Sequence, residues 1–394
     1  MQARDGDKAG RRNVLLLGLV SFINDTSSKI ILPILPLFIA EVGGTGLAVG
    51  IIAGVSDSLA SLFKMVAGYL SDRRGRRRGF VFSGYLLSAA AKTGLAAATV
   101  WPHVLALRVG ERLGKGLRAA PRDALLASAT DGGRRGRGFG VHRAMDSAGA
   151  VLGALLAFAL YWFWGWGFEA IFLVAGLLGF VALAPLAFVH ESAVRRQTNA
   201  KRPTLRWREL APALRRFLAA AGLFALANFS YMFFVLRSES AFSGALAVGL
   251  PILLYALYNV SYTLFAVPAG VLSDRFGRRA VLFAGYGLFV LVCAGFAVAR
   301  SLPAFIALFL LFGLNYALVN ATERALVSDL AEEEGRGTAL GTYYLTTSLA
   351  ALPGGLLAGL LWDLDPQWTF VYGAVTAGAA IALLRRVPAS RQTE

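Results

Sequence analysis

The chain has 394 residues, of which 57% are hydrophobic and 16% are charged, and its mean hydropathy is +0.60. Soluble proteins usually carry about 25% charged residues, so the composition excludes an ordinary soluble domain and indicates a helical protein that crosses the membrane many times. The formal net charge is +16, but the basic residues lie in short segments between apolar stretches, which favours orientation in the bilayer over binding of nucleic acid. The single cysteine, Cys293, excludes an intramolecular disulfide and a cysteine-based metal site.

Apolar stretches long enough to cross a hydrocarbon core of about 30 Å occur twelve times along the chain. The expected spans are residues 13–38, 46–70, 79–100, 102–127, 139–163, 168–189, 212–236, 246–272, 280–299, 303–328, 338–361 and 367–386. The polar, basic segment 190–211 predicts a linker between two bundles of six helices, 13–189 and 212–386. We therefore expect an all-α membrane protein with short tails at 1–12 and 387–394.

Arginine residues are concentrated in the loops on one side of the predicted spans, such as Arg73 to Arg78 and Arg134 to Arg137. Since basic loops stay in the cytoplasm, and an even number of spans leaves both ends on one side, we expect both termini to be cytoplasmic. The apolar run after the basic N-terminal segment continues too far for a removable signal peptide. The expected location is the bacterial cytoplasmic (inner) membrane, with the lipid bilayer as the surroundings of a multi-pass chain.

Residues 107–123, LRVGERLGKGLRAAPRD, carry many charged side chains inside a predicted span. At about 100° per residue, all of these side chains share one helix face. They are Arg108, Glu111, Arg112, Lys115, Arg118, Arg122 and Asp123. An ionisable group near the bilayer centre costs at least about 2.5 kcal/mol and is by default a functional candidate. Arg108 lies one turn from Glu111 and can neutralise it, whereas Arg122 and Asp123 lie at the cytoplasmic end.

The two halves of the chain repeat each other. GYLSDRRGRR at Gly68 matches GVLSDRFGRR at Gly270, 202 residues later, and FGVHRAMDSAGAVLGALLA at Phe139 matches LGTYYLTTSLAALPGGLLA at Leu340, 201 residues later. Parallel repeats of this kind are typical of transporters built from two bundles, which bind their substrate between the bundles near mid-membrane. The repeat therefore predicts a transporter.

The chain resembles the major facilitator superfamily over its whole length. The segments 68–77 and 270–279 are similar to the loop motif that this family has between helices 2 and 3 and again between helices 8 and 9. Residues 108–120 are similar to the helix 4 motif of proton-coupled drug and metabolite antiporters, with Arg112 at the position of the family's buried arginine. Lys115 and Arg118 depart from that motif, which has a glutamine and a small residue there. Half of the exporters' helix 5 motif is present, as Gly149 and Gly153, without its proline.

The resemblance implies twelve helices in two bundles related by a pseudo-twofold axis, and secondary transport by alternating access. Proton coupling requires a buried carboxyl whose affinity for a proton changes when a cation approaches. Asp25 and Asp57, halfway along the first two spans, meet this requirement, followed by Glu111 with Arg112 as the neighbouring cation. Because the second half has neutral groups where the first has charges, such as Asn259 at the position of Asp57, we expect proton coupling in the first half.

The resemblance also implies a network of charged groups at the cytoplasmic ends of the helices, which holds the halves together and opens during transport. In this chain the gating residues are Asp72, Arg73, Arg76, Arg122, Asp123, Arg143, Asp146, Asp274, Arg275, Arg278, Glu323 and Arg324. A static structural role is the alternative for these groups, and for Asp57 and Asp146 the alternative is an internal salt bridge between helices.

Substrate-binding candidates combine the departures from the helix 4 motif with polar groups on the seventh and tenth spans. They are Lys115, Arg118, Asn228, Tyr231, Asn315 and Asn320. These groups suit a small organic solute that can form hydrogen bonds, although tyrosines of membrane helices are often interfacial anchors. We expect proton-coupled export. The alternatives are a facilitator or importer of an organic anion, drawn by the positive surplus of residues 107–123, and a flippase for lipids or other amphiphiles.

Enzymatic activity is not expected. His103, His142 and His190 lie at span ends or on different spans, and the motifs H-E-x-x-H and G-x-S-x-G do not occur. We therefore expect no catalytic site, no metal and no cofactor, with the proton gradient as the energy source. The resemblance implies a monomer without an obligatory protein partner.

Overall fold

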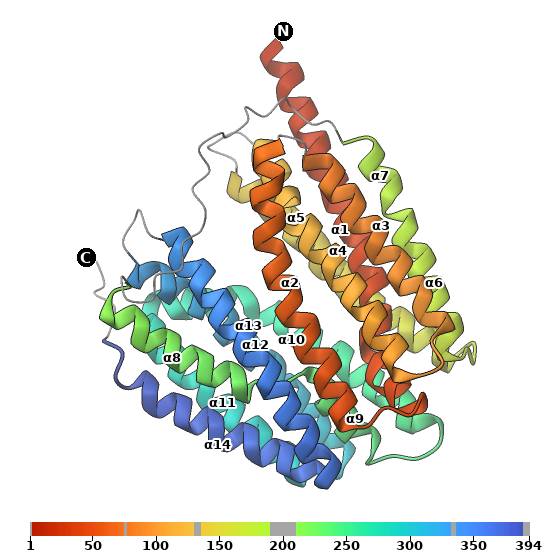
Figure 1. Ribbon diagram of the computed structural model, residues 1–394, viewed down its shortest axis with the longest axis vertical. Coiled ribbons are helices and arrows are strands. Elements are labelled where there is room, and N and C mark those ends of the chain that lie inside the picture. Colours follow the sequence, from red (N-terminus) through yellow and green to blue (C-terminus); the bar gives the residue numbers. More distant parts are fainter. Residues whose placement is uncertain (1, 75–76, 130–134, 190–209, 332–335, 389–394) are drawn as a thin grey trace. The chain divides into compact units, whose positions relative to one another are not determined.

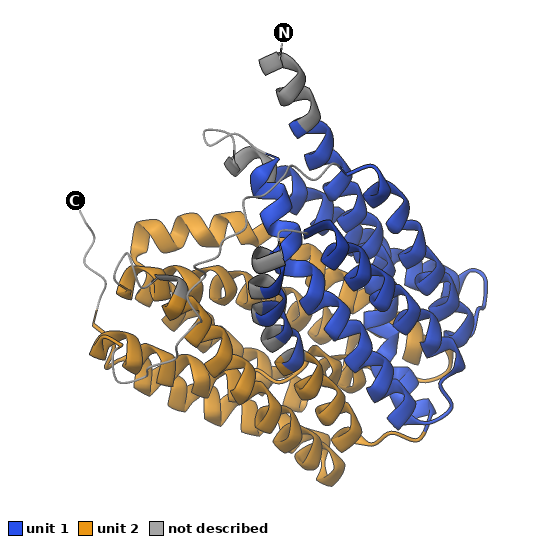
Figure 2. Cartoon of the chain, turned by 45° about the horizontal axis from the view of Figure 1, so that its top comes forward, with its two compact units in different colours: residues 1–42, 59–201 blue, residues 43–58, 202–394 orange. Residues whose placement is uncertain are grey.

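The structure is a computed structural model, which describes residues 2–74, 77–129, 135–189, 210–331 and 336–388 (Figure 1). Within these ranges every regular element is a helix. Contacts divide the chain into two compact units, which Figure 2 shows in blue and orange. Unit 1 contains residues 1–42 and 59–201, and unit 2 contains residues 43–58 and 202–394. The predicted linker 190–211 lies almost entirely outside the described residues.

The helices of the first half pack around α1, which contacts α5 and α6, while α3 packs on α4 and α6. Their bounds are α1 (Gln2–Glu41), α2 (Gly46–Arg74), α3 (Arg77–Gly94), the 3-10 helix η1 (Leu95–Ala97), α4 (Trp101–Ser128), α5 (Arg135–Trp162), α6 (Phe168–Val181) and α7 (Leu183–Ala187). The contacts of α2 differ along its length, because its first part, to Ser58, groups with unit 2. There Gly50 lies against the backbone of Gly355.

The helices of the second half pack around α12, which contacts α10 and α11, and around α8, which contacts α13 and α14. Their bounds are α8 (Pro212–Ala227), α9 (Tyr231–Glu239), α10 (Ala245–Phe276), α11 (Arg278–Val298), α12 (Leu302–Leu330), α13 (Arg336–Leu364) and α14 (Pro366–Leu384). Proline stands in the first turn of α4, α8, α12 and α14. Its fixed φ and missing N–H suit that position, so the sequence itself marks where these helices begin.

The prediction of an all-helical protein with twelve spans is confirmed, because each predicted span lies on one helix or on two consecutive helices. Ten segments of the described chain are long and apolar enough to cross a membrane. The remaining two predicted spans lie on α2 and α4. The charged side chains of α4 lower its hydropathy, so composition alone would not identify this helix as a membrane span. Its place among the other helices of the fold does.

Two predicted spans are each divided into two helices. Pro185 has no N–H to donate to the preceding turn, and the helix is interrupted at Ala182, between α6 and α7. Asn228 ends α8, and Ser230 begins α9, where its hydroxyl accepts a hydrogen bond of 3.3 Å from the N–H of Met232. Tyr372 donates to the carbonyl of Leu226 at 2.9 Å, so the backbone groups left by this second break have partners.

Glycine allows the helices of unit 1 to approach closely. A Cβ added at Gly114 of α4 would lie 2.9 Å from the backbone nitrogen of Ser88, and one at Gly84 of α3 would lie 2.6 Å from the carbonyl oxygen of Gly114. On α5, Gly149 and Gly153 lie in the same way against the backbone of Phe22 and Thr26 of α1. Small residues at such contacts let membrane helices pack with their backbones in contact.

Gly114→Ala is expected to lower the free energy of unfolding by about 1–3 kcal/mol, because the new methyl group pushes α3 away from α4. Gly110→Ala is the matched control on the same helix, since its Cβ would lie 3.6 Å from that of Ala91, an ordinary contact. There alanine favours the helix by up to about 1 kcal/mol. Unfolding of the purified variants in detergent compares the two, and equal stability of both would contradict the close contact.

Candidate functional site

The charged face of α4 begins with a buried ion pair. Arg108 is 1% exposed and its guanidinium donates to the carboxylate of Glu111, which is also buried. Removing one partner of a buried pair leaves a charge in an apolar site, so the two side chains depend on each other. The expectation that Arg108 neutralises Glu111 agrees with this geometry, and it reduces the part that Glu111 can take in proton exchange.

The next turns of α4 separate its cations by their surroundings. Lys115 is exposed, Arg112 is half-buried, and Arg118 is buried with its guanidinium carbon 4.6 Å from the centre of the Tyr85 ring. The aromatic face attracts the guanidinium, which holds Arg118 against α3. Lys115 is therefore the more accessible of the two cations at which the chain departs from the helix 4 motif.

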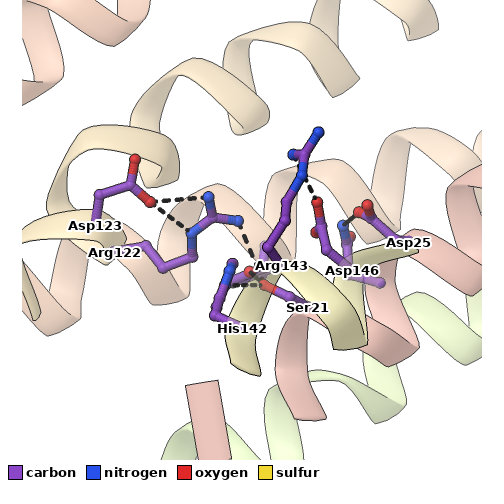
Figure 3. A network of polar contacts seen from close by, with 9 residues as sticks. Ser21, Asp25, Arg122, Asp123, His142, Arg143 and Asp146 are labelled. Carbon is purple, nitrogen blue, oxygen red and sulfur yellow. Dashed lines mark hydrogen bonds and ion pairs between the residues drawn. The ribbon is translucent and has the colours of Figure 1, made fainter. Parts of the chain in front are cut away.

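A pair of carboxyl groups lies between α1 and α5. The side chains of Asp25 on α1 and Asp146 on α5 lie beside each other (Figure 3). Asn24 donates to Oδ1 of Asp25 at 3.2 Å, and Arg143 forms an ion pair of 3.4 Å with Asp146. Figure 3 shows Asp146 between Arg143 and Asp25. The close approach of Gly149 and its neighbours to α1 brings the two carboxyl groups together.

The placement of two carboxyl groups side by side has a chemical consequence. Two carboxylates repel each other, and a proton on one of them relieves that repulsion. Sequence analysis placed Asp25 among the proton-coupling residues and Asp146 in the gate. The geometry groups Asp146 with Asp25 instead, and its ion pair lies within α5 rather than between helices.

Lys92 of α3 is a functional candidate that sequence analysis missed. It is 1% exposed, and its ammonium donates to Oγ of Ser27 at 3.0 Å, to Oδ1 of Asn24 at 3.1 Å and to the Asn24 carbonyl at 3.4 Å. Because Asn24 in turn donates to Asp25, Lys92 reaches the carboxyl pair through one amide group. The available signal was a lysine inside the apolar span 79–100, which is costly enough to indicate a role.

A second polar cluster lies near the C-terminal end of α4, beside α1. Arg122 pairs with Asp123 at 2.9 Å and donates to Oγ of Ser21 at 3.3 Å. The same hydroxyl lies 2.8 Å from Nε2 of His142 (Figure 3). It also lies 3.5 Å from the hydroxyl of Tyr85. Arg122 and Asp123 were predicted as gating residues, and the structure joins them to residues of α1, α3 and α5 within unit 1.

Several predicted residues fall outside the described side chains. Arg76 lies in an undescribed segment, and the side chains of Asp57, Asp72 and Arg73 are likewise outside the description. Their proposed roles in proton coupling and gating remain predictions from the sequence.

In unit 2, most predicted gating residues lie at the end of α10 and the start of α11. Arg278 contacts the carboxylate of Asp274, forms an ion pair of 3.2 Å with Asp329, and donates to Ser273 at 2.9 Å. Arg275 is exposed, with its guanidinium 5.5 Å from the ring centre of Phe276. The repeated loop motif therefore forms a charge cluster inside unit 2.

Glu323 differs from the other predicted gating residues. It is 5% exposed and accepts hydrogen bonds from the hydroxyls of Tyr286 and Tyr343, at 2.5 and 2.6 Å. Its neighbour Arg324 is exposed and donates to the carbonyl of Asn320. Glu323 was predicted as a gating residue, and the structure places its carboxyl inward, between two tyrosines, rather than in an ion pair.

The predicted substrate-binding residues of unit 2 have different surroundings. Asn315 is 1% exposed and donates to the carbonyl of Gly285 at 2.7 Å, which is a contact between helices α12 and α11. Asn228 ends α8 at the break, and Asn320 is half-buried. Tyr231 begins α9 and its ring centre lies 5.0 Å from that of Tyr255.

The structure brings Tyr231 together with other tyrosines that were not among the predicted site residues. Successive ring contacts of 5.0 to 6.0 Å between centres join five of them. They are Tyr231, Tyr255, Tyr258, Tyr316 and Tyr262. They come from α9, α10 and α12, so their proximity depends on packing that a single sequence does not show. Among the described residues no group of three His, Cys, Asp or Glu side chains could hold a metal ion.

Known proteins similar to this chain are transporters. The sequence profile of the Major Facilitator Superfamily matches residues 17–253 and 222–394. An MFS-type transporter of Methanocaldococcus jannaschii is 40% identical over 378 residues, which cover 95% of this chain and 94% of that relative. The multidrug resistance protein MdtH of Aeromonas hydrophila is 27% identical over 366 residues, which cover 91% of this chain and 89% of that protein.

Solved structures share the fold. The crystal structure of the nucleoside transporter NupG has a TM-score of 0.76 at 15% identity and covers 95% of this chain and 98% of its own. A bacterial homologue of the human lysosomal transporter Spinster has a TM-score of 0.74 at 14% identity, covering 95% of this chain and 96% of its own. At such identities the likeness concerns the fold alone.

The buried pair of α4 gives a prediction about stability. Arg108→Met alone is expected to lower the free energy of unfolding by about 3–5 kcal/mol, because Glu111 stays buried without its partner. The double variant Arg108→Met/Glu111→Met removes both charges and should recover most of that loss. A double-mutant cycle of detergent unfolding measures this, and purely additive losses would show that the two residues do not act as a pair.

Proposed function

Since this chain belongs to the major facilitator superfamily, we propose that it is a secondary transporter that exports a small organic solute in exchange for protons. The observation that carries the proposal is the placement of Asp25 and Asp146 side by side between α1 and α5. Two neighbouring carboxyl groups between helices can bind one proton, which is what a proton-driven carrier needs. The name of the relative MdtH, a multidrug resistance protein, supports the direction of transport.

The coupling follows from the charges around Asp25. Lys115, Lys29 and Arg118 are the cations that act on this carboxyl. A cationic or hydrogen-bonding solute that binds at Asp25 competes with the proton, so solute and proton occupy the site in turn. By linkage, such competition makes proton entry release the solute, which is exchange. Lys92, through Asn24, holds the α1 side of the carboxyl pair in place.

The accessible cation Lys115 favours a second candidate, the transport of an organic anion. An anion bound at Lys115 withdraws positive charge from Asp25 and thereby favours a proton on that carboxyl. Proton and anion then bind together, so the two are transported in the same direction. Because the two candidates couple the proton with opposite sign, the pH dependence of ligand binding separates them.

The remaining features of the proposal concern the oligomeric state, location, orientation and energy source of the protein. The protein works as a monomer in the cytoplasmic membrane, with both termini in the cytoplasm and the proton gradient as its energy source. The support for this orientation is the concentration of arginines in the loops on one side of the predicted spans. The gating role of the charge clusters at Asp123 and at Arg278 belongs to the same proposal.

Ligand screening of the purified protein tests the charge of the solute. A ligand present at about 100 times its Kd adds about 2.7 kcal/mol to the stability of the folded state. For exchange, we expect cationic or neutral compounds to raise the melting temperature, and to do so more at alkaline pH. Lys115→Gln should leave that effect unchanged. Stabilisation by anions that increases at acid pH and disappears in Lys115→Gln would favour the second candidate instead.

Asp25→Asn tests the coupling with a compound found in that screen. In proteoliposomes, we expect the variant to lose accumulation driven by a pH gradient and to keep exchange of labelled for unlabelled solute, because asparagine keeps the size and polarity of aspartate but cannot bind the proton. Glu169→Gln, in the exposed first turn of α6, is the control and should keep both activities. Driven accumulation at the wild-type rate in Asp25→Asn would exclude Asp25 as the coupling site.

A further inference from the structure

Glu323 lies on α12 in unit 2, where residues of α11 and α13 contact it. The Tyr286 hydroxyl of α11 donates to its Oε1 and the Tyr343 hydroxyl of α13 donates to its Oε2. The ring of Phe224, from α8, stacks on Tyr286 with 3.8 Å between centres. Arg324, the next residue of α12, is exposed and donates to the carbonyl of Asn320.

The internal repeat shows that this position is polar in both halves. Adding the offset of 201 residues found for Phe139 and Leu340 takes Arg122 to Glu323, Tyr85 to Tyr286 and His142 to Tyr343. The equivalent residues of unit 1 also meet, through the hydroxyl of Ser21. The same three helices therefore build a polar cluster in each unit, but the central side chain is a cation in one and a carboxyl in the other.

The chemistry of the cluster points to a proton. A carboxylate in an apolar unit without a close cation is costly, and glutamine would satisfy the same two tyrosines without that cost. Tyrosine hydroxyls can donate to the carboxylate or accept from the carboxylic acid. The two tyrosines can therefore hold Glu323 in either protonation state without a change of packing.

We propose that Glu323 is a second proton-binding site of this transporter, formed by α11, α12 and α13 with the hydroxyls of Tyr286 and Tyr343. Glu323 binds its proton within unit 2 and needs no solute to do so. A role of this proton in transport rests on the proposed proton-coupled function, but the binding of the proton does not depend on that function. The carboxyl is 5% exposed, so exchange of its proton requires α12 to move relative to α11 or α13.

Infrared difference spectroscopy of the purified full-length protein tests the site directly. A pH change across the titration of Glu323 should produce the C=O band of a carboxylic acid, and Glu323→Gln should remove the equivalent of one carboxyl from that signal. Tyr286→Phe and Tyr343→Phe each remove a donor to the carboxylate. Each should therefore shift the midpoint of the same band upward by about one pH unit or more.

Asp25→Asn is the comparison, because it removes a different carboxyl and should leave the Glu323 band in place. A titrating band that is the same in Glu323→Gln as in the wild type would overturn the proposal, as would midpoints unchanged in both tyrosine variants. The tyrosine variants keep the test decisive if Glu323→Gln does not fold. Loss of the band in Glu323→Gln would support this site. If Asp25→Asn also kept driven transport at the wild-type rate, the coupling site at Asp25 would be rejected while this site remained.

Discussion

The cost of burying charge inside an apolar helical unit governs where the ionisable side chains of this protein lie. Three of the clusters meet that cost in three ways. Arg108 and Glu111 cancel each other within one turn of α4. Asp25 and Asp146 lie side by side, an arrangement that a proton on one of them stabilises. Glu323 is held by two hydroxyl groups. The first cluster needs no proton, whereas we propose that each of the other two binds one.

Close helix packing is what makes these clusters possible. Gly149 and Gly153 bring α5 against the backbone of α1, and Asp146 lies one turn before Gly149. Larger residues at those positions would separate the helices and move the two carboxyl groups apart. The packing explains why α5 keeps the two glycines of the exporters' helix 5 motif, since these glycines position the site that we propose for the proton. The missing proline has no part in that packing.

The two repeats have diverged in charge more than in architecture. Corresponding helices place a polar cluster at the same position of each unit, around Arg122 in one and Glu323 in the other. The first unit combines cations with a carboxyl pair, and the described part of the second combines five neighbouring tyrosines with the buried carboxyl of Glu323. A protein with proton sites in both halves would have more than one way to couple its cycle to the gradient.

The sequence by itself determined the fold class, the twelve spans and the repeat, because apolar length and proline position are local properties of the chain. It also selected Asp25, Glu111 and the cations of α4, since a charge inside an apolar span is visible without a structure. Only the tertiary structure decided which charges cancel each other and which carboxyl groups lie beside another carboxyl or between hydroxyl groups. Lys92, Asp146 and Glu323 depend on partners from other helices, and their roles follow from contacts that spacing along one helix does not contain. The sequence located the charges, and packing between helices determined their chemistry.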